Sequence, residues 1–172
     1  SQIRAQINNL GTNMLVIAPG FSNMGGVNQG AGSFNRLTLA DADKLKREAT
    51  LVNAVSPVIT TRVQGLAGGN NWRVEVNGVS EEYAIIRDWQ TTSGAWFTDM
   101  DVRTNRKVAL VGSTVAEALF GDTDPVGQRI QLRGVPFDII GVLAGKGQTA
   151  NGRDQDDVVL IPYTTANTRL SG

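Results

Sequence analysis

Residues 124–143 read DPVGQRIQLRGVPFDIIGVL, and this stretch decides the fold class. Asp124-Pro125 predicts a turn, because both residue types favour turn conformations. Two segments rich in strand-forming residues, 128–133 and 136–143, flank Gly134-Val135, which is the pattern of a hairpin. We therefore expect two strands here and a fold rich in β-structure.

Further strands are predicted on both sides of this hairpin. Residues 72–77 alternate apolar and polar side chains, which indicates a half-buried strand. Asn77-Gly78 is a hairpin turn signal, so residues 82–87 are expected to form the returning strand. Residues 52–63 read as extended, with a break at Pro57. Apolar runs predict buried strands at 13–19, 107–111 and 158–161.

Helices are predicted at four places. The clearest covers residues 38–49, where Thr38 is a suitable N-cap and Asp41 follows three residues later. The other three are expected at 1–10, at 114–120 with Ser113 as the cap, and from Pro162 to Leu170. Strands and helices in this order predict an α+β fold whose second part, from about residue 60, is β-rich.

The composition excludes several kinds of site. The 172 residues contain no His and no Cys, so Ser–His and Cys–His nucleophile pairs and zinc sites of the usual kind are excluded. Sixteen basic and sixteen acidic residues cancel, without the basic excess of a nucleic-acid-binding domain. The segment 141–147 has neither the glycine spacing nor the Ser/Thr of a phosphate-binding loop. We expect no catalytic residue, no cofactor and no metal, and take Asp154, Asp156 and Asp157 as solvated loop carboxylates.

Two groups of apolar residues are candidates for binding. Trp72, Trp89, Trp96 and Phe97 are interpreted as core residues, with a ligand pocket as the alternative. The Gly- and Asn-rich segment 20–35 reads as a long loop. Its apolar members either contact a partner or fold back on the domain, and they are the partner-binding candidates: Phe21, Met24 and Phe34.

Several motifs occur in an order that resembles a known family. They are Gly11-Thr-Asn-Met-Leu-Val-Ile, Thr38-Leu-Ala-Asp-Ala-Asp, Gly94-Ala-Trp-Phe97, Lys107-Val-Ala-Leu-Val-Gly112, Leu119-Phe-Gly121, Asp124-Pro-Val-Gly-Gln128, Pro136-Phe-Asp-Ile-Ile-Gly-Val-Leu143 and Ile161-Pro162. The chain is similar throughout to the periplasmic core domain of MacB-type ABC transporters, within the FtsX-like permease superfamily. The segment from 124 to 143 is the most specific part of this resemblance.

The resemblance implies a mixed-sheet, porter-like half-lobe (strand-helix-strand) at 1–60. An inserted β-rich (Sabre-like) lobe with short helices would follow at 61–172. It implies a periplasmic location at the bacterial inner membrane, between two membrane helices of an ABC efflux permease. The implied partners are a periplasmic adaptor (membrane fusion) protein, a second copy of the transporter and the flanking membrane helices. The implied function is to dock the adaptor and transmit ATP-driven motion during export, without catalysis.

The beginning and end of the chain add two expectations. Ser1-Gln2-Ile3 has no initiator Met and no signal peptide, so we expect a piece of a longer protein. The family's second strand-helix-strand segment is expected to be missing after Gly172, which would leave an unpaired sheet edge. Four alternatives stay open: a lipoprotein-releasing permease, a peptide-handling permease, a stand-alone extracytoplasmic ligand-binding module, and a hydrolase with a Ser/Lys or carboxylate site.

Overall fold

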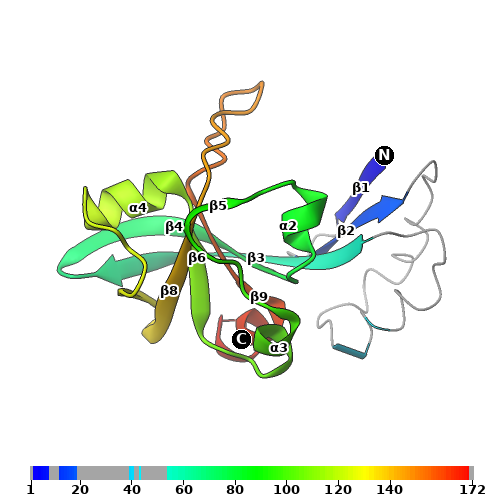
Figure 1. Ribbon diagram of the computed structural model, residues 1–172, viewed down its shortest axis with the longest axis horizontal. Coiled ribbons are helices and arrows are strands. Elements are labelled where there is room, and N and C mark those ends of the chain that lie inside the picture. Colours follow the sequence, from blue (N-terminus) through cyan, green and yellow to red (C-terminus); the bar gives the residue numbers. More distant parts are fainter. Residues whose placement is uncertain (1, 8–11, 19–38, 41–42, 44–53, 171–172) are drawn as a thin grey trace.

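A computed structural model describes residues 2–7, 12–18, 39–40, 43 and 54–170. Within these residues the fold is α+β, and nine strands form one mixed sheet (Figure 1). The strands are β1 (Gln2–Ile7), β2 (Thr12–Ala18), β3 (Ala54–Ala67), β4 (Asn70–Val79), β5 (Thr91–Gly94), β6 (Val108–Val111), β7 (Arg129–Leu132), β8 (Val135–Leu143) and β9 (Val158–Pro162). The helices are α2 (Tyr83–Ile86), α3 (Asp99–Arg103), α4 (Ser113–Phe120), α5 (Tyr163–Thr165) and the π-helix η3 (Ala166–Leu170).

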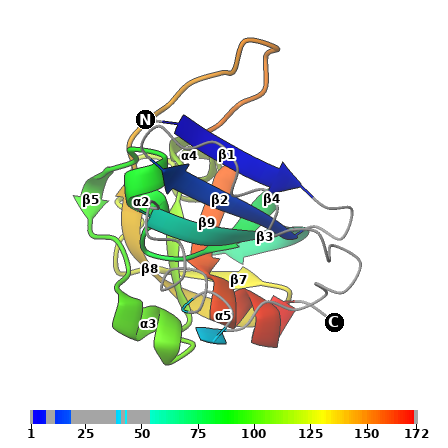
Figure 2. The same cartoon turned by 90° about the vertical axis from the view of Figure 1, so that its right-hand side faces the viewer.

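Six of the strands close into a small barrel. They pair in the order β3, β4, β9, β6, β8 and β7, and β7 pairs back with β3. The β4–β9 and β6–β8 pairs are parallel, and the other pairs in the ring are antiparallel. Strands β2 and β1 extend the sheet beyond β3, and β5 extends it beyond β8 (Figures 1 and 2).

The apolar runs of β6 and β9 serve two cores at once. Successive side chains of a strand point to opposite faces. Val111 of β6 and Val159 of β9 therefore belong to a barrel core, to which all six ring strands and the helices α4 and η3 contribute. Leu110 and Leu160 instead join a side core that contains residues of α2, α3 and α5. Because both faces of these strands are covered, their sequences are apolar without alternation.

The hairpin formed by β7 and β8 was correctly predicted from the sequence. Its turn lies at Arg133-Gly134, one residue before the predicted position, and both residues have positive φ angles of 52° and 76°. The predicted strands at 13–19, 72–77, 107–111 and 158–161 are confirmed as β2, β4, β6 and β9. Helices α4 and α5 with η3 confirm two of the four predicted helices.

The helix expected at 1–10 is wrong for the part described, because residues 2–7 form strand β1 along β2. Ile3, Ala5 and Ile7 also have the two-residue spacing of a strand, and pairing with β2 selects that alternative. Of the helix expected at 38–49, Leu39, Ala40 and Asp43 are helical, and its other residues lie outside the described part.

The hairpin expected at Asn77-Gly78 is also wrong, because both residues lie inside β4 and pair with β9. A side chain at Gly78 would place its Cβ 2.6 Å from the Cβ of Ala166, so this glycine allows β4 and η3 to approach closely. The predicted returning strand at 82–87 is instead helix α2.

Two smaller predictions also fail. Strand β3 runs through Pro57, which lies opposite Met14 of β2, so the proline does not break it. The N-cap of α4 is Gly112 and not Ser113, and it makes no side-chain cap hydrogen bond. The proposed domain boundary at residue 60 stays a prediction; strand β3 is continuous across that position.

Candidate functional site

The most prominent surface feature is an arm formed by residues 144–157, which connects β8 to β9. Strand β6 lies between β8 and β9 in the sheet, so this connection must cross over the end of β6. The arm extends well beyond the body of the domain (Figures 1 and 2). The sequence predicted a polar loop here but gave no indication of the hydrogen bonds that hold its base.

Two aspartates hold the base of the arm. Asp156 is only 7% exposed, and its carboxylate accepts the backbone N–H groups of Lys146 at 2.8 Å and Gly147 at 3.0 Å. Asp154 accepts the backbone N–H of Asp156 at 2.9 Å and the hydroxyl of Thr114, on α4, at 2.7 Å. The expectation of solvated loop carboxylates is therefore wrong for Asp156, which is buried and bonded to the backbone.

A cation–aromatic cluster ties the arm to the segment between α2 and β5. Trp89 donates its indole N–H to the carbonyl of Ala144 at 2.7 Å. The Lys146 ammonium lies 5.4 Å from the Trp89 ring centroid and donates to the carbonyl of Arg87 at 2.8 Å. The Arg87 guanidinium lies 5.6 Å from the same ring and donates to Gln155 at 3.1 Å. The cluster thus joins the arm to the segment that follows α2.

The opposite side of the arm is attached to the β3–β4 hairpin. Arg153 forms an ion pair with Glu75 of β4, which also pairs with Arg62 of β3 at 3.2 Å. Trp72 donates its indole N–H to Asp157 at 2.8 Å. These contacts add to those of the base, so the arm is fixed from two sides.

A groove lies beside the cluster, between α2 and β5. Its volume is about 600 Å³, and its lining includes Ile85, Trp89 and Trp96. Ile85 is 67% exposed, which leaves an apolar side chain at the rim. The aromatic residues divide accordingly: Trp89 and Phe97 are core residues as predicted and Trp96 is partly buried, whereas Trp72 is 39% exposed and is not in the core.

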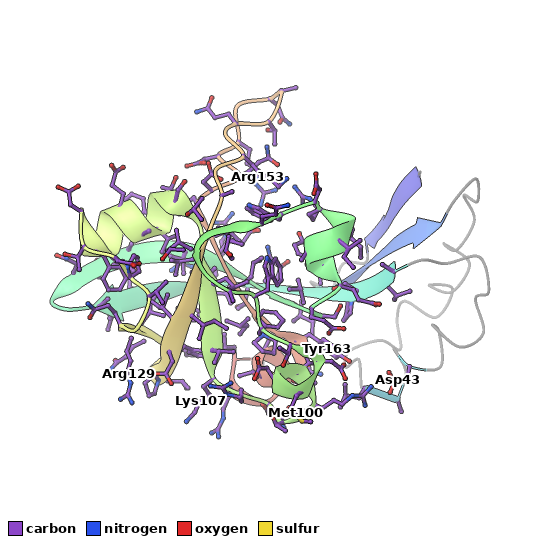
Figure 3. All side chains as sticks on the ribbon, viewed as in Figure 1. Asp43, Met100, Lys107, Arg129, Arg153 and Tyr163 are labelled. Carbon is purple, nitrogen blue, oxygen red and sulfur yellow. The ribbon has the colours of Figure 1, made fainter. Side chains whose placement is uncertain are left out.

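A second polar cluster joins α3 to residue 43 (Figure 3). Arg103 donates to Asp99 at 2.7 Å and to Asp43 at 3.2 Å. Tyr163 lies beside this cluster, and burial raises the pKa of its phenol well above the usual range. Hydrogen bonds to Asp99 and Asp43 raise the pKa of the Arg103 guanidinium, which stays charged. This cluster links Asp43 to α3, which packs in the side core.

The described residues contain no group of three or more acidic side chains arranged to hold a metal ion. No helix in the described part is both long and apolar enough to cross a lipid bilayer. The candidates Phe21, Met24 and Phe34 lie outside the described residues. The surface that the structure does describe offers hydrogen-bonding and apolar contacts, which suit binding.

The arrangement of strands and helices has counterparts in known proteins. The sequence profile of the MacB-like periplasmic core domain matches residues 1–172. The chain belongs to that family. The domain is therefore a periplasmic one of the MacB type, as the sequence motifs predicted.

Curated relatives and solved structures agree with this assignment. The chain is 38% identical over 172 residues to the macrolide export ATP-binding/permease protein MacB of Chlorobaculum tepidum and covers 26% of that protein. It is 39% identical over 176 residues to the MacB protein of Rhodospirillum rubrum, with 99% of this chain and 26% of that protein covered. The MacB-like chain thus spans about a quarter of the length of these relatives.

Two solved structures share the fold. The periplasmic region of MacB from Actinobacillus actinomycetemcomitans has a TM-score of 0.70 at 20% identity, covering 94% of this chain and 69% of that one. The extracellular domain of the transporter YknZ from Gram-positive bacteria has a TM-score of 0.57 at 21% identity, covering 65% of this chain and 55% of that one. At these identities the likeness concerns the fold.

Proposed function

We propose that this MacB-like domain docks a periplasmic adaptor and transmits ATP-driven motion within an inner-membrane ABC exporter. The observation that carries the proposal is the family match over the whole chain, together with relatives whose names join ATP binding and export. The exporter acts as a homodimer, and its ATP-binding part and membrane helices lie outside this chain. The domain itself contributes contacts with its partners that differ between two conformational states of the transporter.

The attachments of the arm support this proposal. An element that transmits motion must not bend at its base, because a flexible joint would absorb the displacement. The base of the arm is bonded to α4 through Thr114 and to the C-cap of α2 through Arg87, and Arg153, nearer the tip, pairs with Glu75 of β4. We propose that the arm is one docking element for the adaptor and that a displacement at its tip is passed to the barrel.

The division into two lobes belongs to the same proposal. Residues 1–60 would form half of a porter-like lobe, and 61–172 an inserted lobe. Strand β3 belongs to both and is paired to β2 at one end and β4 at the other. A shift of one lobe is thereby coupled to the other through continuous backbone.

The decisive experiment uses the full-length transporter that contains this domain, together with the adaptor encoded beside it. The arm tip, residues 149–152, is replaced by a short Gly-Ser turn, which leaves Arg153 and its ion pair with Glu75 in place. The matched control carries the same replacement at Asp122-Thr123, in the exposed α4–β7 loop. We expect the tip variant to lose adaptor co-purification and adaptor-stimulated ATP hydrolysis, while basal hydrolysis and the control stay unchanged. Normal co-purification by the tip variant would refute a docking role for the arm.

Phe21, Met24 and Phe34 remain proposed adaptor contacts. Replacing each by Ser in the same transporter is expected to weaken adaptor pull-down, and unchanged pull-down in all three variants would reject them. The adjacent genes distinguish the alternatives: an adaptor gene favours an exporter, and a periplasmic lipoprotein carrier favours a lipoprotein-releasing permease.

The groove between α2 and β5 favours a second candidate function, which is ligand binding. Trp89 and Trp96 both line it, so a small apolar ligand would change their fluorescence. Titration with a panel of apolar compounds tests this function. The matched control is the Ile85→Asp variant, which places a charge at the rim of the groove. If no compound changes the fluorescence of either the native chain or the variant, ligand binding in this groove is rejected.

A further inference from the structure

The barrel is closed by a very short ladder. Strands β3 and β7 share only the pairs Gly65–Leu132 and Leu66–Gln131, whereas β3 and β4 share nine pairs. Beyond Leu66 the two strands separate, and a groove of about 570 Å³ opens between the β3–β4 turn and β7. We call this the seam groove; its lining includes Leu66, Gly68, Gly69, Arg129, Gln131 and Pro136.

The backbone of Arg129 faces this groove. The two-residue turn of the β7–β8 hairpin makes Leu132–Val135 a hydrogen-bonded pair, and bonded and non-bonded pairs alternate along the ladder. Arg129–Asp138 is thus a non-bonded pair, and Asp138 directs its N–H the other way, to the carbonyl of Lys107 at 2.9 Å. The N–H and C=O of Arg129 therefore point away from β8, towards the seam groove. An edge of this kind is a template for an added strand.

The side chains around this edge provide an apolar contact. Leu66 is 44% exposed although it lies within the sheet, and Pro136 lines the same groove. Gly68 and Gly69 have positive φ angles, and a Cβ built on either would have no atom within 4 Å. The turn above the groove therefore leaves space for another backbone.

The groove carries an exposed cationic side chain, and further arginines lie on the strands around it. Of the described residues that line the seam groove, Arg129 is the one with a charged side chain. Its guanidinium is 73% exposed and binds Asp138 through Nε at 3.0 Å, which leaves its terminal nitrogens available. Arg73 of β4 and Arg133 of the β7–β8 turn are also exposed, and Arg133 donates to the backbone carbonyl of Leu170. A negatively charged segment is the complement of this surface.

We propose that the seam groove binds an extended, acidic segment of a partner protein, which adds to the free edge of β7 as a short strand. An apolar side chain of the segment packs against Leu66 and Pro136, and a neighbouring carboxylate pairs with Arg129. Main-chain hydrogen bonds contribute affinity, while the alternating apolar and acidic side chains give specificity. This proposal is independent of adaptor docking through the arm, because it uses a different surface and concerns any partner protein in the periplasm.

The probe is a fluorescein-labelled hexapeptide of alternating leucine and glutamate, and binding to the full chain is followed by fluorescence anisotropy. Three comparison probes are a leucine–lysine hexapeptide, the acidic peptide with its backbone nitrogens methylated, and vesicles with one third anionic phosphatidylglycerol. We expect the acidic peptide to bind at least tenfold more tightly than the lysine and methylated peptides. Binding should weaken as salt rises, because the paired charges are exposed.

Two variants locate the site. Leu66→Thr removes the apolar contact but keeps a strand-forming residue, and Arg129→Gln removes the charge. The matched control is Arg153→Gln, which makes the same change of charge on the arm, on the opposite side of the domain (Figure 3). Each seam variant should weaken peptide binding three- to tenfold, and the control should not change it.

Nuclear magnetic resonance then tests the geometry, since strand addition must shift the amide resonance of Arg129. A shift of that resonance, with weakened binding in both seam variants, supports the proposal. Three results would each overturn it: equal binding of the lysine peptide, equal loss in the Arg153→Gln control, or binding of the anionic vesicles without binding of the acidic peptide. Circular dichroism on each variant verifies that the fold is retained.

Discussion

Replacing Asp156 by Ala is the sharpest test of how the arm is held. The carboxylate accepts two backbone N–H groups at 2.8 and 3.0 Å and is almost fully buried. A hydrogen bond to a charged group contributes about 1.5–3 kcal/mol, and unsatisfied donors add a desolvation cost. Gly147 is exposed and Lys146 is half-buried, so water replaces part of what is lost. We expect a loss of about 2–3 kcal/mol in the free energy of unfolding.

The assay is urea unfolding followed by tryptophan fluorescence, with thermal unfolding alongside it. For a domain of this size the loss corresponds to a fall of roughly 4–12 °C in melting temperature. Asp122→Ala is the matched control, because that aspartate is exposed in the α4–β7 loop, and its effect should stay within about 0.5 kcal/mol. Amide exchange of the arm should accelerate in Asp156→Ala alone. If both variants unfold like the parent chain, the carboxylate does not anchor the arm and the reasoning fails.

Three further predictions follow from the core, the cluster and a perturbed carboxyl group. Leu110→Ala, in the side core, should lower the free energy of unfolding by about 2–5 kcal/mol in urea titrations, because it leaves a cavity. Trp89→Phe keeps most of the ring but loses the bond to Ala144, so we expect a cost of about 1 kcal/mol and faster amide exchange of the arm. Burial would raise the pKa of Asp101, but hydrogen bonds from Thr98 and Arg106 outweigh it and lower that pKa. Because the folded-state pKa lies below the unfolded one, this stability is present above about pH 4 and is lost as pH falls further. Asp101→Asn should therefore flatten the acid limb of a stability–pH curve, and an unchanged limb would contradict the assignment.

The sequence was most informative where a pattern has one physical explanation. The apolar runs that became β6 and β9 had to be buried on both faces, and the turn between β7 and β8 contains Gly134, which tolerates positive φ. Asn77-Gly78 was misread because glycine serves two purposes. Glycine can form a turn, or it can allow another element to pack closely against a strand. At Gly78 it allows η3 to pack against β4, which is evident only from the neighbouring residues in the fold.

The candidate site was less predictable than the strands. Closure of the barrel depends on β3 meeting β7, which are far apart in the chain and carry no local signal for each other. The role of Asp156 depends on the backbone of residues ten positions earlier, so its spacing from Asp154 and Asp157 suggested only a surface cluster. Phe21, Met24 and Phe34 remain predictions.

The two-pair ladder between β3 and β7 also has a consequence for the kinetics of folding. Closing the ring joins segments separated by more than sixty residues, so the loop-closure entropy must be lost before the contacts compensate for it. Proteins dominated by such long-range pairings fold in milliseconds to seconds. We expect the β7–β8 hairpin to form early and the seam to close late. The seam would then also be the first part of the ring to open when the native domain fluctuates, well before either core is exposed.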